Sequence, residues 1–382
     1  MKIVLKDIVK QIRGVSFKPE DVEDTPGNFR ITLFRANNIE NGKLNYQNLY
    51  YIPREKVKDD QLIRANDILI SASSGSKNAI GKAVRISHDL NATFGAFCKV
   101  IRPIKCYSIY LGYYFQSPKY RTYIANTCQG ANINNIRSKD IDEITINLPS
   151  KDELNKRCKI LSNLSDLIDL REKQLHYFDG LIKSRFVEMF STINNMVRLK
   201  DICSIITDGT HQPPKFVSKG IPFIFVSNII NDTIDLSTDK YIDESTYQAL
   251  IKRTPIEIGD LILSTVGSYG HPAVVKTKDR FLFQRHIAYL KPIQKYVRAE
   301  YLHSAMQSDF VQRQIERQVK GIAQKTLNLT AIKKLIVPIP TLSEQIKFIK
   351  FKEQADKSRL KIETSSNMIQ HMIQYNVKHQ IF

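Results

Sequence analysis

One stretch of the sequence, from Lys151 to Phe190, most limits how this chain can fold. It contains no proline, and its only glycine is Gly180. Apolar residues recur at alternating three- and four-residue steps, with one missed step at Arg171: Leu154, Leu161, Leu164, Ile168, Leu175, Phe178 and Ile182. This period predicts a long helix that packs on another helix. At about 1.5 Å per residue the helix would be roughly 55–60 Å long, too long for most single globular domains.

The sequence before this helix is repeated after it. Three ordered pairs of segments agree: Leu5-Lys6-Asp7-Ile8 with Leu199-Lys200-Asp201-Ile202, Asn66 to Ser71 with Gly259 to Ser264, and Gly130 to Glu153 with Gly321 to Glu344. The offset between the copies stays nearly constant, as small loop insertions would produce. The residues between these segments differ widely, so we expect one framework that carries two different sets of loops.

Each copy has the pattern of a mixed α/β domain. Strands are expected at Ile31–Phe34, Ile68–Ile70, Phe223–Val226, Leu261–Leu263 and Ile287–Leu290, and short helices at Tyr110–Asn126 and Glu300–Val319. Pro149, Pro338 and Pro340 close the copies just before a helix, where proline is tolerated. We therefore divide the chain into a first domain at 1–150, a central helix at 151–192, a second domain at 193–341 and a final helix at 342–382.

The final helix has a clear start and a weaker apolar stripe than the central one. Ser343 is a plausible N-cap, and Glu344 places a negative charge in the first turn. The expected stripe is Ala355, Ile362, Met368, Ile369 and Met372, interrupted by Ser358 and Ser365. We expect the two long helices to pair antiparallel as a coiled coil, which would relate the two domains by an approximate two-fold axis.

Composition limits the class of partner. A formal net charge of +19 indicates a polyanion, with nucleic acid as the first candidate. The alternatives are a charge that only keeps the protein soluble, an acidic protein partner and an anionic membrane. The membrane is the weakest of these, because the charge is dispersed along the chain. The sequence has neither a signal peptide at its start nor an apolar stretch near the roughly 20 residues that span a bilayer. We expect a soluble, cytoplasmic protein whose five cysteines are reduced thiols.

Catalytic motifs are missing from the sequence. We find no P-loop, no G-x-S-x-G elbow, no H-E-x-x-H and no zinc-deaminase pair, and the only Pro-Pro, at Pro213-Pro214, lacks the surroundings of an adenine-methyltransferase motif. Asp208, His211, His271 and His286 match no metal-ligand spacing, so ordinary polar roles are the better interpretation.

Polar, glycine-bearing loops instead occupy corresponding places in the two copies. Their residue types can approach phosphates or read base edges. In the first copy the candidates are Ser73, Ser74, Ser76, Lys77, Asn132, Asn134, Asn135 and Arg137. In the second copy they are Thr210, His211, Gln212, Ser268, Tyr269, Gln324 and Lys325. Solvated turns are the alternative for each residue taken singly, and the repetition of the loops favours a binding role for the set.

Several segments of the second copy then carry a family resemblance. They are Asp208 to Lys215, Gly220 to Ile224, Val226 to Ile229, Gln284 to Ala288, Gly321 with Gln324, and Ile336 to Pro340 with Ser343-Glu344-Gln345. Together with two divergent domains that each end in a long helix, they resemble the specificity subunit of type I restriction–modification systems. The first copy departs in detail, with Gly14-Val15-Ser16 where the second has Gly209-Thr210-His211.

The resemblance implies a function and further contact residues. Each copy would be a target-recognition domain that reads one half of a bipartite, asymmetric site in double-stranded DNA, and Lys215, Arg285 and His286 would join the DNA contacts. The helices would set the spacing of the half-sites and dock two methyltransferase subunits, and restriction subunits would join them.

The resemblance also implies that the chain is not an enzyme and holds no metal or cofactor. S-adenosylmethionine, ATP and Mg²⁺ would belong to the partner subunits, in a system that methylates DNA for host defence. The alternative is a stand-alone nucleic-acid-modifying enzyme or nuclease whose catalytic site the sequence does not reveal.

Overall fold

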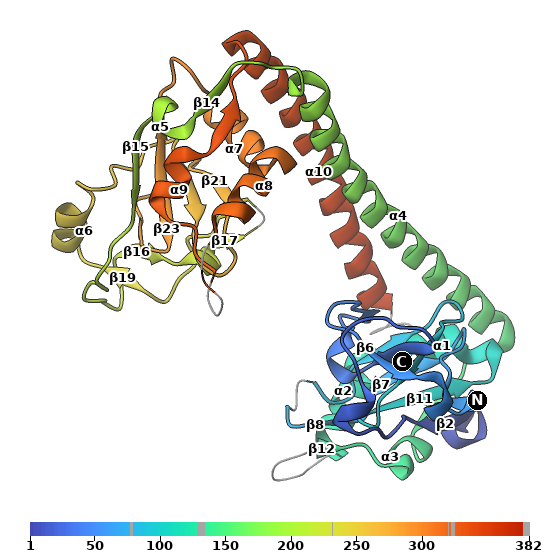
Figure 1. Ribbon diagram of the computed structural model, residues 1–382. Coiled ribbons are helices and arrows are strands. Elements are labelled where there is room, and N and C mark those ends of the chain that lie inside the picture. The colour runs from blue at the N-terminus through green and yellow to red at the C-terminus, as the bar shows by residue number, and fades with distance from the viewer. Residues whose placement is uncertain (77–78, 128–133, 231, 320, 322–324, 377–382) are drawn as a thin grey trace. The chain divides into compact units, whose positions relative to one another are not determined.

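The computed structural model describes residues 1–76, 79–127, 134–230, 232–319, 321 and 325–376 (Figure 1). The chain forms two compact units. Unit 1 contains Met1–Glu172 and the end of the chain from Glu363, and unit 2 contains Lys173–Ile362. Each unit therefore includes part of both long helices, α4 (Lys151–Phe190) and α10 (Leu342–Asn376).

Unit 1 is built on two main sheets. The four-stranded antiparallel sheet has the order β2 (Val9–Arg13), β11 (Cys98–Pro103), β7 (Ile68–Ser71), β9 (Ala83–Arg85). The three-stranded sheet has the order β10 (Ala92–Phe94), β3 (Arg30–Phe34), β6 (Tyr50–Pro53), with β10 parallel to β3. Three small pairs complete it: β1 (Lys2–Val4) with β13 (Thr145–Asn147), β4 (Ile39–Glu40) with β5 (Lys43–Leu44), and β8 (Ser73–Ser74) with β12 (Asn134–Asn135).

Short helices cover these sheets. The α-helices of unit 1 before α4 are α1 (Ser108–Tyr114), α2 (Pro118–Thr127) and α3 (Ser138–Asp142). Its 3₁₀ turns are η1 (Leu5–Asp7), η2 (Pro19–Asp21), η3 (Ala36–Asn38), η4 (Arg54–Lys56), η5 (Asp59–Gln61) and η6 (Lys105–Tyr107). Helix α1 packs on strands β9 and β11, so the sheet carries its helical cover beside its β9 edge.

Unit 2 repeats this plan. Its four-stranded sheet has the order β15 (Cys203–Asp208), β23 (Ile287–Pro292), β20 (Leu261–Ser264), β21 (Pro272–Val274), and its three-stranded sheet the order β19 (Tyr241–Ile242), β16 (Ile221–Ile224), β22 (Leu282–Phe283). The small pairs are β14 (Met196–Arg198) with β24 (Ile336–Pro338), and β17 (Ile229–Ile230) with β18 (Thr233–Ile234). Its helices are α5 (Leu199–Ile202), η7 (Val226–Asn228), α6 (Glu244–Leu250), α7 (Ala299–Gln307), α8 (Asp309–Gln318) and α9 (Leu329–Lys334).

The predicted internal repeat is confirmed at the level of hydrogen bonds. Asn38 accepts from the Arg35 N–H at 2.9 Å, and its side-chain amide donates to two carbonyls further along the chain. Asn228 makes the same three bonds, accepting from the Phe225 N–H at 3.0 Å. The two asparagines therefore fix the same turn after β3 and β16, although the sequences around them differ.

Three of the helices and strands predicted from the sequence end at other residues in the structure. A proline and two polar side chains account for the differences. The helix expected at Tyr110–Asn126 is split into α1 and α2 at Pro118, because a proline ring is accepted at a helix start and not inside one. The helix expected at Glu300–Val319 is split into α7 and α8 by Ser308, which caps α8 by accepting from the Val311 N–H. Strand β16 stops at Ile224, because Asn228 turns the next residues into η7.

The start of α10 was also assigned to the wrong residue. The side-chain oxygen of Thr341 accepts from the Glu344 N–H at 3.4 Å, while a Glu344 carboxylate oxygen accepts from the Thr341 N–H at 2.9 Å. This reciprocal pair is a capping box, with Thr341 as the cap. Ser343, the predicted cap, lies inside the first turn of the helix.

The predicted contact stripe of α4 is confirmed, whereas that of α10 was partly wrong. Leu154, Leu161 and Ile168 of α4 are buried, and the missed step at Arg171 is a half-buried arginine that continues the stripe. In α10, Met368 and Met372 are 63% and 52% exposed. The positions on the packed side are Phe348, Lys352, Ala355, Arg359, Ile362, Ser366, Ile369 and Ile373. The polar residues among them hid this heptad period from a search for apolar residues.

Within unit 2 the two long helices pair antiparallel. Phe186 of α4 lies 5.4 Å from Phe348 of α10 between ring centroids, and Asp179 of α4 accepts from Arg359 at 2.7 Å. Phe190 also contacts Tyr301 of α7, with ring centroids 5.1 Å apart. The helix pair therefore belongs to the core of unit 2. In unit 1, Leu154 and Leu161 of α4 and Ile373 of α10 join a core cluster in the same way.

Candidate nucleic-acid interface

The polar loops of unit 2 meet at one edge of its four-stranded sheet, where β15 and β20 end and β21 and β23 begin. Thr210 donates its N–H to the Phe283 carbonyl at 3.0 Å, and Arg285 donates its own to the Thr210 carbonyl at 3.0 Å. Thr265 N–H bonds to the His286 carbonyl at 2.9 Å. We call this the loop edge of unit 2.

The last predicted loop reaches the same edge. Leu327 donates its N–H to the Thr265 carbonyl at 2.8 Å, and Val266 forms an isolated bridge with Thr326. Lys325 is exposed beside this bridge. Gln324 lies outside the described residues. Segments from four places in the sequence, around Thr210, Ser268, Arg285 and Lys325, are therefore brought together, as the loop-based interpretation expects.

A glycine permits the closest approach at this edge. A Cβ atom on Gly209 would lie 2.2 Å from the Phe283 carbonyl oxygen and 2.5 Å from that of Gln284, closer than real atoms pack. Gly14 of unit 1 is equally crowded, because a Cβ atom there would lie 2.1 Å from the Gly95 carbonyl oxygen. The two glycines occupy the same structural place, which supports matching Gly14-Val15-Ser16 with Gly209-Thr210-His211.

His211 is held by a cluster that the sequence did not reveal. Its Nε2 lies 2.9 Å from an Asp208 carboxylate oxygen. Arg253, from the turn after α6, bonds the other carboxylate oxygen and also donates Nε–H to the Asp208 carbonyl at 3.2 Å. The Arg253 guanidinium lies 3.4 Å from His211 Nε2. Because Arg253 is distant from Asp208 in sequence, only the fold places it at the loop edge.

The remaining candidates of unit 2 differ in exposure. Gln212, Lys215, Ser268 and Arg285 are exposed. His286 is half-buried, and burial, followed by the nearby Arg285 charge, lowers its pKa, so it is a neutral ring near pH 7. Tyr269 packs against the core of the unit through part of its ring. Whether each of these side chains contacts DNA stays a prediction.

The loop edge of unit 1 is built in the same way. Ser73 donates its N–H to the Phe97 carbonyl at 3.0 Å, and Ile136 donates its N–H to the Ala72 carbonyl at 2.8 Å. Strand β8 pairs with β12, so Ser73 lies opposite Asn135 and Ser74 opposite Asn134. Ser74 Oγ also accepts from the Ser76 N–H at 3.1 Å. Lys77 and Asn132 lie outside the described residues.

Arg137 and a buried lysine support this edge. The Arg137 side chain forms an ion pair with the buried Asp140, at 2.9 Å from Nη2. Lys99 is only 7% exposed, and its ammonium group donates to Gln11 Oε1 at 3.1 Å and to the Ile136 carbonyl at 3.3 Å. Burial lowers the pKa of Lys99. Sequence reasoning missed Lys99, because strand alternation alone does not show that a lysine points inward.

The four residues considered for a metal do not gather into one site. Asp208 and His211 join the arginine cluster, and His286 lies beside Arg285 instead, with 3.3 Å between the Arg285 Nε and His286 Nε2 atoms. Across the residues that the structure describes, no group of three His, Cys, Asp or Glu side chains could hold a metal ion. A search of the same residues finds no helix long and apolar enough to cross a membrane.

The comparison with known families decides what the two loop edges belong to. Residues 1–176 and 194–370 each match the type I restriction modification DNA specificity domain. The chain belongs to this family. Each match contains one loop edge and part of a long helix, so the family domain and the structural repeat coincide. The chain is a DNA specificity subunit of a type I restriction–modification system, as the sequence resemblance implied.

Individual relatives agree. The chain is 27% identical over 372 residues to the EcoKI specificity subunit of Escherichia coli K12, covering 90% of this chain and 79% of that one. It is 36% identical over 173 residues to the StySPI specificity subunit of Salmonella potsdam, covering 45% of this chain and 37% of that one.

Solved structures show the same fold. The type I restriction–modification S subunit from M. genitalium superposes with a TM-score of 0.53 at 15% identity, over 100% of this chain and 96% of the other. A chain from a study of complex assembly in the type I system gives a TM-score of 0.56 at 14% identity, over 99% and 97% of the two chains.

Proposed function

We propose that this specificity subunit reads a bipartite, asymmetric site in double-stranded DNA, one half with the loop edge of each unit. The two target-recognition domains would be residues 1–150 and 193–341, with the helices at 151–192 and 342–382 as the spacer. The observation that carries the proposal is that both loop edges use one backbone framework with different side chains. The backbone pairing of Ser73 with Asn135 in unit 1 is matched by the pairing of Val266 with Thr326 in unit 2, so equivalent positions carry different side chains.

A chain that only recognises DNA needs partner subunits that carry out the chemistry. Two methyltransferase subunits would dock on the chain, and restriction subunits would join them in the cytoplasm. S-adenosylmethionine, ATP and Mg²⁺ would be held by those subunits, and this chain would do no chemistry itself. The two loop edges support this assignment, because their polar side chains can bind phosphates and base edges.

A methylation assay tests the proposal. The purified chain, its methyltransferase subunit and the mixture are each incubated with genomic DNA and labelled S-adenosylmethionine. We expect label in DNA only from the mixture, at one interrupted sequence that methylome sequencing identifies. Label transferred by the chain alone would instead favour a stand-alone modifying enzyme. A continuous, uninterrupted recognition sequence would contradict the assignment of one half-site to each unit.

A further inference from the structure

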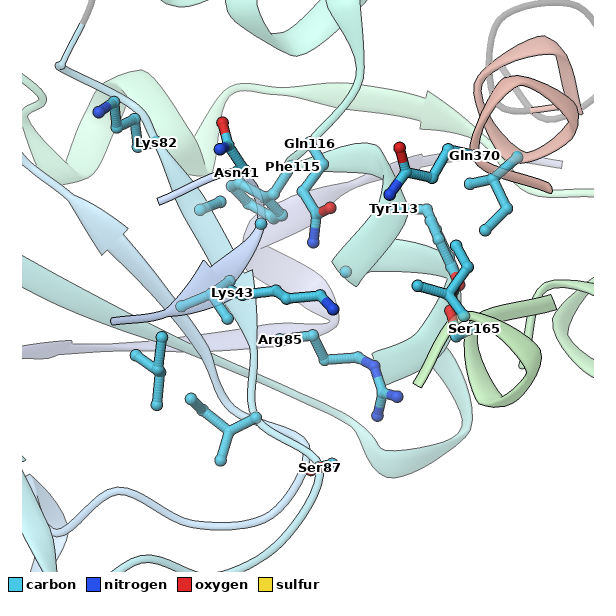
Figure 2. Close-up of a pocket in the computed structure, with 18 of the residues that line it drawn as sticks. Asn41, Lys43, Lys82, Arg85, Ser87, Tyr113, Phe115, Gln116, Ser165 and Gln370 are labelled. Carbon is cyan, nitrogen blue, oxygen red and sulfur yellow. Dashed lines mark hydrogen bonds between the residues drawn. The ribbon is translucent and has the colours of Figure 1, made fainter. Parts of the chain in front are cut away.

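A large groove opens in unit 1 along β9, the edge strand of the four-stranded sheet. Its volume is about 1460 Å³. Its walls are β9, the β4–β5 turn, the end of α1, and the parts of α4 and α10 that belong to this unit. Figure 2 shows the side chains of Lys43 and Arg85 extending into the same open space, with Gln116 and Gln370 nearby. We call it the β9 groove.

The β9 groove is basic. Four permanently cationic side chains line it, from Lys43, Lys82, Arg85 and Arg121, and among the described lining residues they face the single carboxylate of Asp169. Lys43 is partly neutralised, because its ammonium group lies 2.5 Å from Glu172 and 3.6 Å from Asp169. Arg121 donates to the Ile80 carbonyl. The surplus positive charge attracts an anion.

Arg85 is the side chain best placed to bind that anion. It is half-buried, and within the described part of the chain its guanidinium makes no hydrogen bond or ion pair. The neighbouring Gly112 gives it room, because a Cβ atom there would lie 2.7 Å from Arg85 Cδ and 3.0 Å from its Cβ. A guanidinium presents a fork of donors that fits two oxygens of a phosphate or carboxylate.

In unit 2 the position that corresponds to the β9 groove is filled by side chains. Tyr110 of α1 and Tyr301 of α7 match, since each donates its hydroxyl to the carbonyl of the strand that follows, at Asn147 and Pro338. Gly112 lies two residues after Tyr110, and the residue two positions after Tyr301 is His303, which is 5% exposed. Lys352 of α10 lies 3.2 Å from His303 Nδ1. A filled site in one unit and an open basic groove in the other indicate that the groove is specific to unit 1.

The groove is continuous with the loop edge of unit 1. Lys82 accepts at its carbonyl from the Ser71 N–H at 2.9 Å, and Ser71 is the residue from which the loop of Ser73 and Ser74 leaves β7. Lys82 therefore lies next to the loop edge, and Arg85 follows at the far end of β9. A duplex that is read at the loop edge and continues along β9 would place its next phosphates beside this strand.

We infer that the β9 groove binds backbone phosphates of the duplex next to the half-site that unit 1 reads, with Arg85 as the main contact. The inference rests on the proposed function and adds a sequence-independent contact to it. Phosphate contacts position a protein on DNA without selecting bases. The groove would thus strengthen binding to every sequence equally and leave the recognised bases to the loop edges.

The test uses the full chain assembled with its methyltransferase subunits. Binding of a cognate and an unrelated duplex is measured at several salt concentrations for the unchanged protein, Arg85→Gln, Arg85→Lys and Lys2→Gln. Lys2 is an exposed lysine on β1 outside the groove and serves as the charge-matched control. We expect Arg85→Gln to lower affinity for both duplexes by the same factor. The slope of log K against log salt should become shallower by about 0.9, the loss of one phosphate contact.

The other variants separate charge from folding. Arg85→Lys should restore most of the slope, and Lys2→Gln should leave it unchanged. An unchanged slope in Arg85→Gln would overturn the inference, while a cognate preference in the unchanged protein would leave the proposed function standing. Weaker assembly with the methyltransferase subunit, at unchanged DNA affinity, would also overturn it in favour of a carboxylate-bearing protein segment. If the wild-type protein bound the cognate and the unrelated duplex equally well, the proposed function itself would have failed.

Discussion

At the scale of single residues, the two loop edges contain side chains with different degrees of freedom. Gln212 is exposed and has no hydrogen-bond partner within the described residues, so its amide is available to a base edge. His211 is instead held by Asp208 and Arg253, and Arg137 by Asp140. Pre-ordered side chains lose less entropy on binding, whereas free ones adapt to the bases that they meet.

We predict that Gln212→Ala changes which sequence is preferred. The lost contact should cost about 1–3 kcal/mol on cognate DNA, because a bidentate base contact is removed, and should leave unrelated DNA unaffected. Lys325→Gln, from the same loop edge, should weaken both equally. Competition binding with the two duplexes measures the difference, and an equal effect of Gln212→Ala on both would refute its assignment to base reading.

We also predict that Lys99→Met loosens one recognition site and not the other. The change keeps the buried stem but removes the ammonium donor to Gln11 and Ile136, at a cost of about 1–3 kcal/mol in the free energy of unfolding. Discrimination at the half-site read by unit 1 should fall. Methylation of oligonucleotides altered in either half checks this, with the exposed Lys10→Met on neighbouring β2 as control. Loss of discrimination at both halves would point to general unfolding.

At the scale of elements, aromatic packing and polar contacts together hold the long helices of unit 2. In unit 2, aromatic rings of α4, α7 and α10 pack together around Phe186, Phe348 and Tyr301. The same helices also carry polar positions, with Lys352 next to His303 and Arg359 paired with Asp179. Polar residues on a helix seam fix its register, because any shift would leave them buried without partners.

This packing makes the stability of unit 2 depend on pH. Burial, together with the charges of Lys352 and Lys276, lowers the pKa of His303 to about 3, and the carbonyl of Pro272 opposes this only weakly. The unfolded chain takes up a proton below pH ~6.5, and the folded one does not. Stability is therefore fully present above pH ~6.5 and falls as the pH drops toward the folded pKa.

We predict that His303→Gln removes part of this dependence. Between pH 7.5 and 5 the wild type should lose about 2 kcal/mol more of its unfolding free energy than the variant, since roughly 1.5 pH units lie below the unfolded pKa. Denaturant melts at the two pH values measure this. His271→Gln, which replaces an exposed histidine of the same unit, serves as the control for the substitution itself. Parallel losses in all three proteins would exclude His303 as the cause.

At the scale of the whole molecule, the two repeated domains share two long helices, α4 and α10. The contact stripe of α10 repeats every seven residues, which is about two helical turns. Its successive positions are Phe348, Ala355, Ile362 and Ile369. An insertion of seven residues in both helices keeps this period, whereas an insertion in one helix shifts the partners relative to each other. The length of the paired helices can therefore be changed without changing either loop edge.

We predict that such a paired insertion, after Asp169 in α4 and at the facing turn of α10, lengthens the unread spacer of the DNA site. Seven residues add about 10 Å, which matches roughly three base pairs at ~3.4 Å each. Methylome sequencing of cells that carry the variant system should show the same half-sites with a longer gap. An unchanged gap would show that the helices do not set it. A seven-residue insertion in α4 alone should destabilise the chain.

The sequence by itself determined the larger features, because they depend on period and repetition. Apolar spacing located α4, the repeated Leu-Lys-Asp-Ile and Asn/Gly-Asp segments located the two domains, and glycine-bearing loops located most of both loop edges. These signals are local, so each can be read without knowing what lies opposite. Polar positions in α10 and capping residues such as Thr341 and Ser308 broke the same patterns, which misplaced the stripe and several boundaries.

Only the tertiary structure decided the contacts between residues that are far apart in the chain. It brought Arg253 to Asp208 and His211, buried Lys99 beneath the first loop edge, and opened the β9 groove where unit 2 has His303. A side chain's partners and exposure depend on which elements pack against it, and that depends on the whole fold. Sequence patterns record the preference of a segment for a helix or a strand, and they do not record its neighbours.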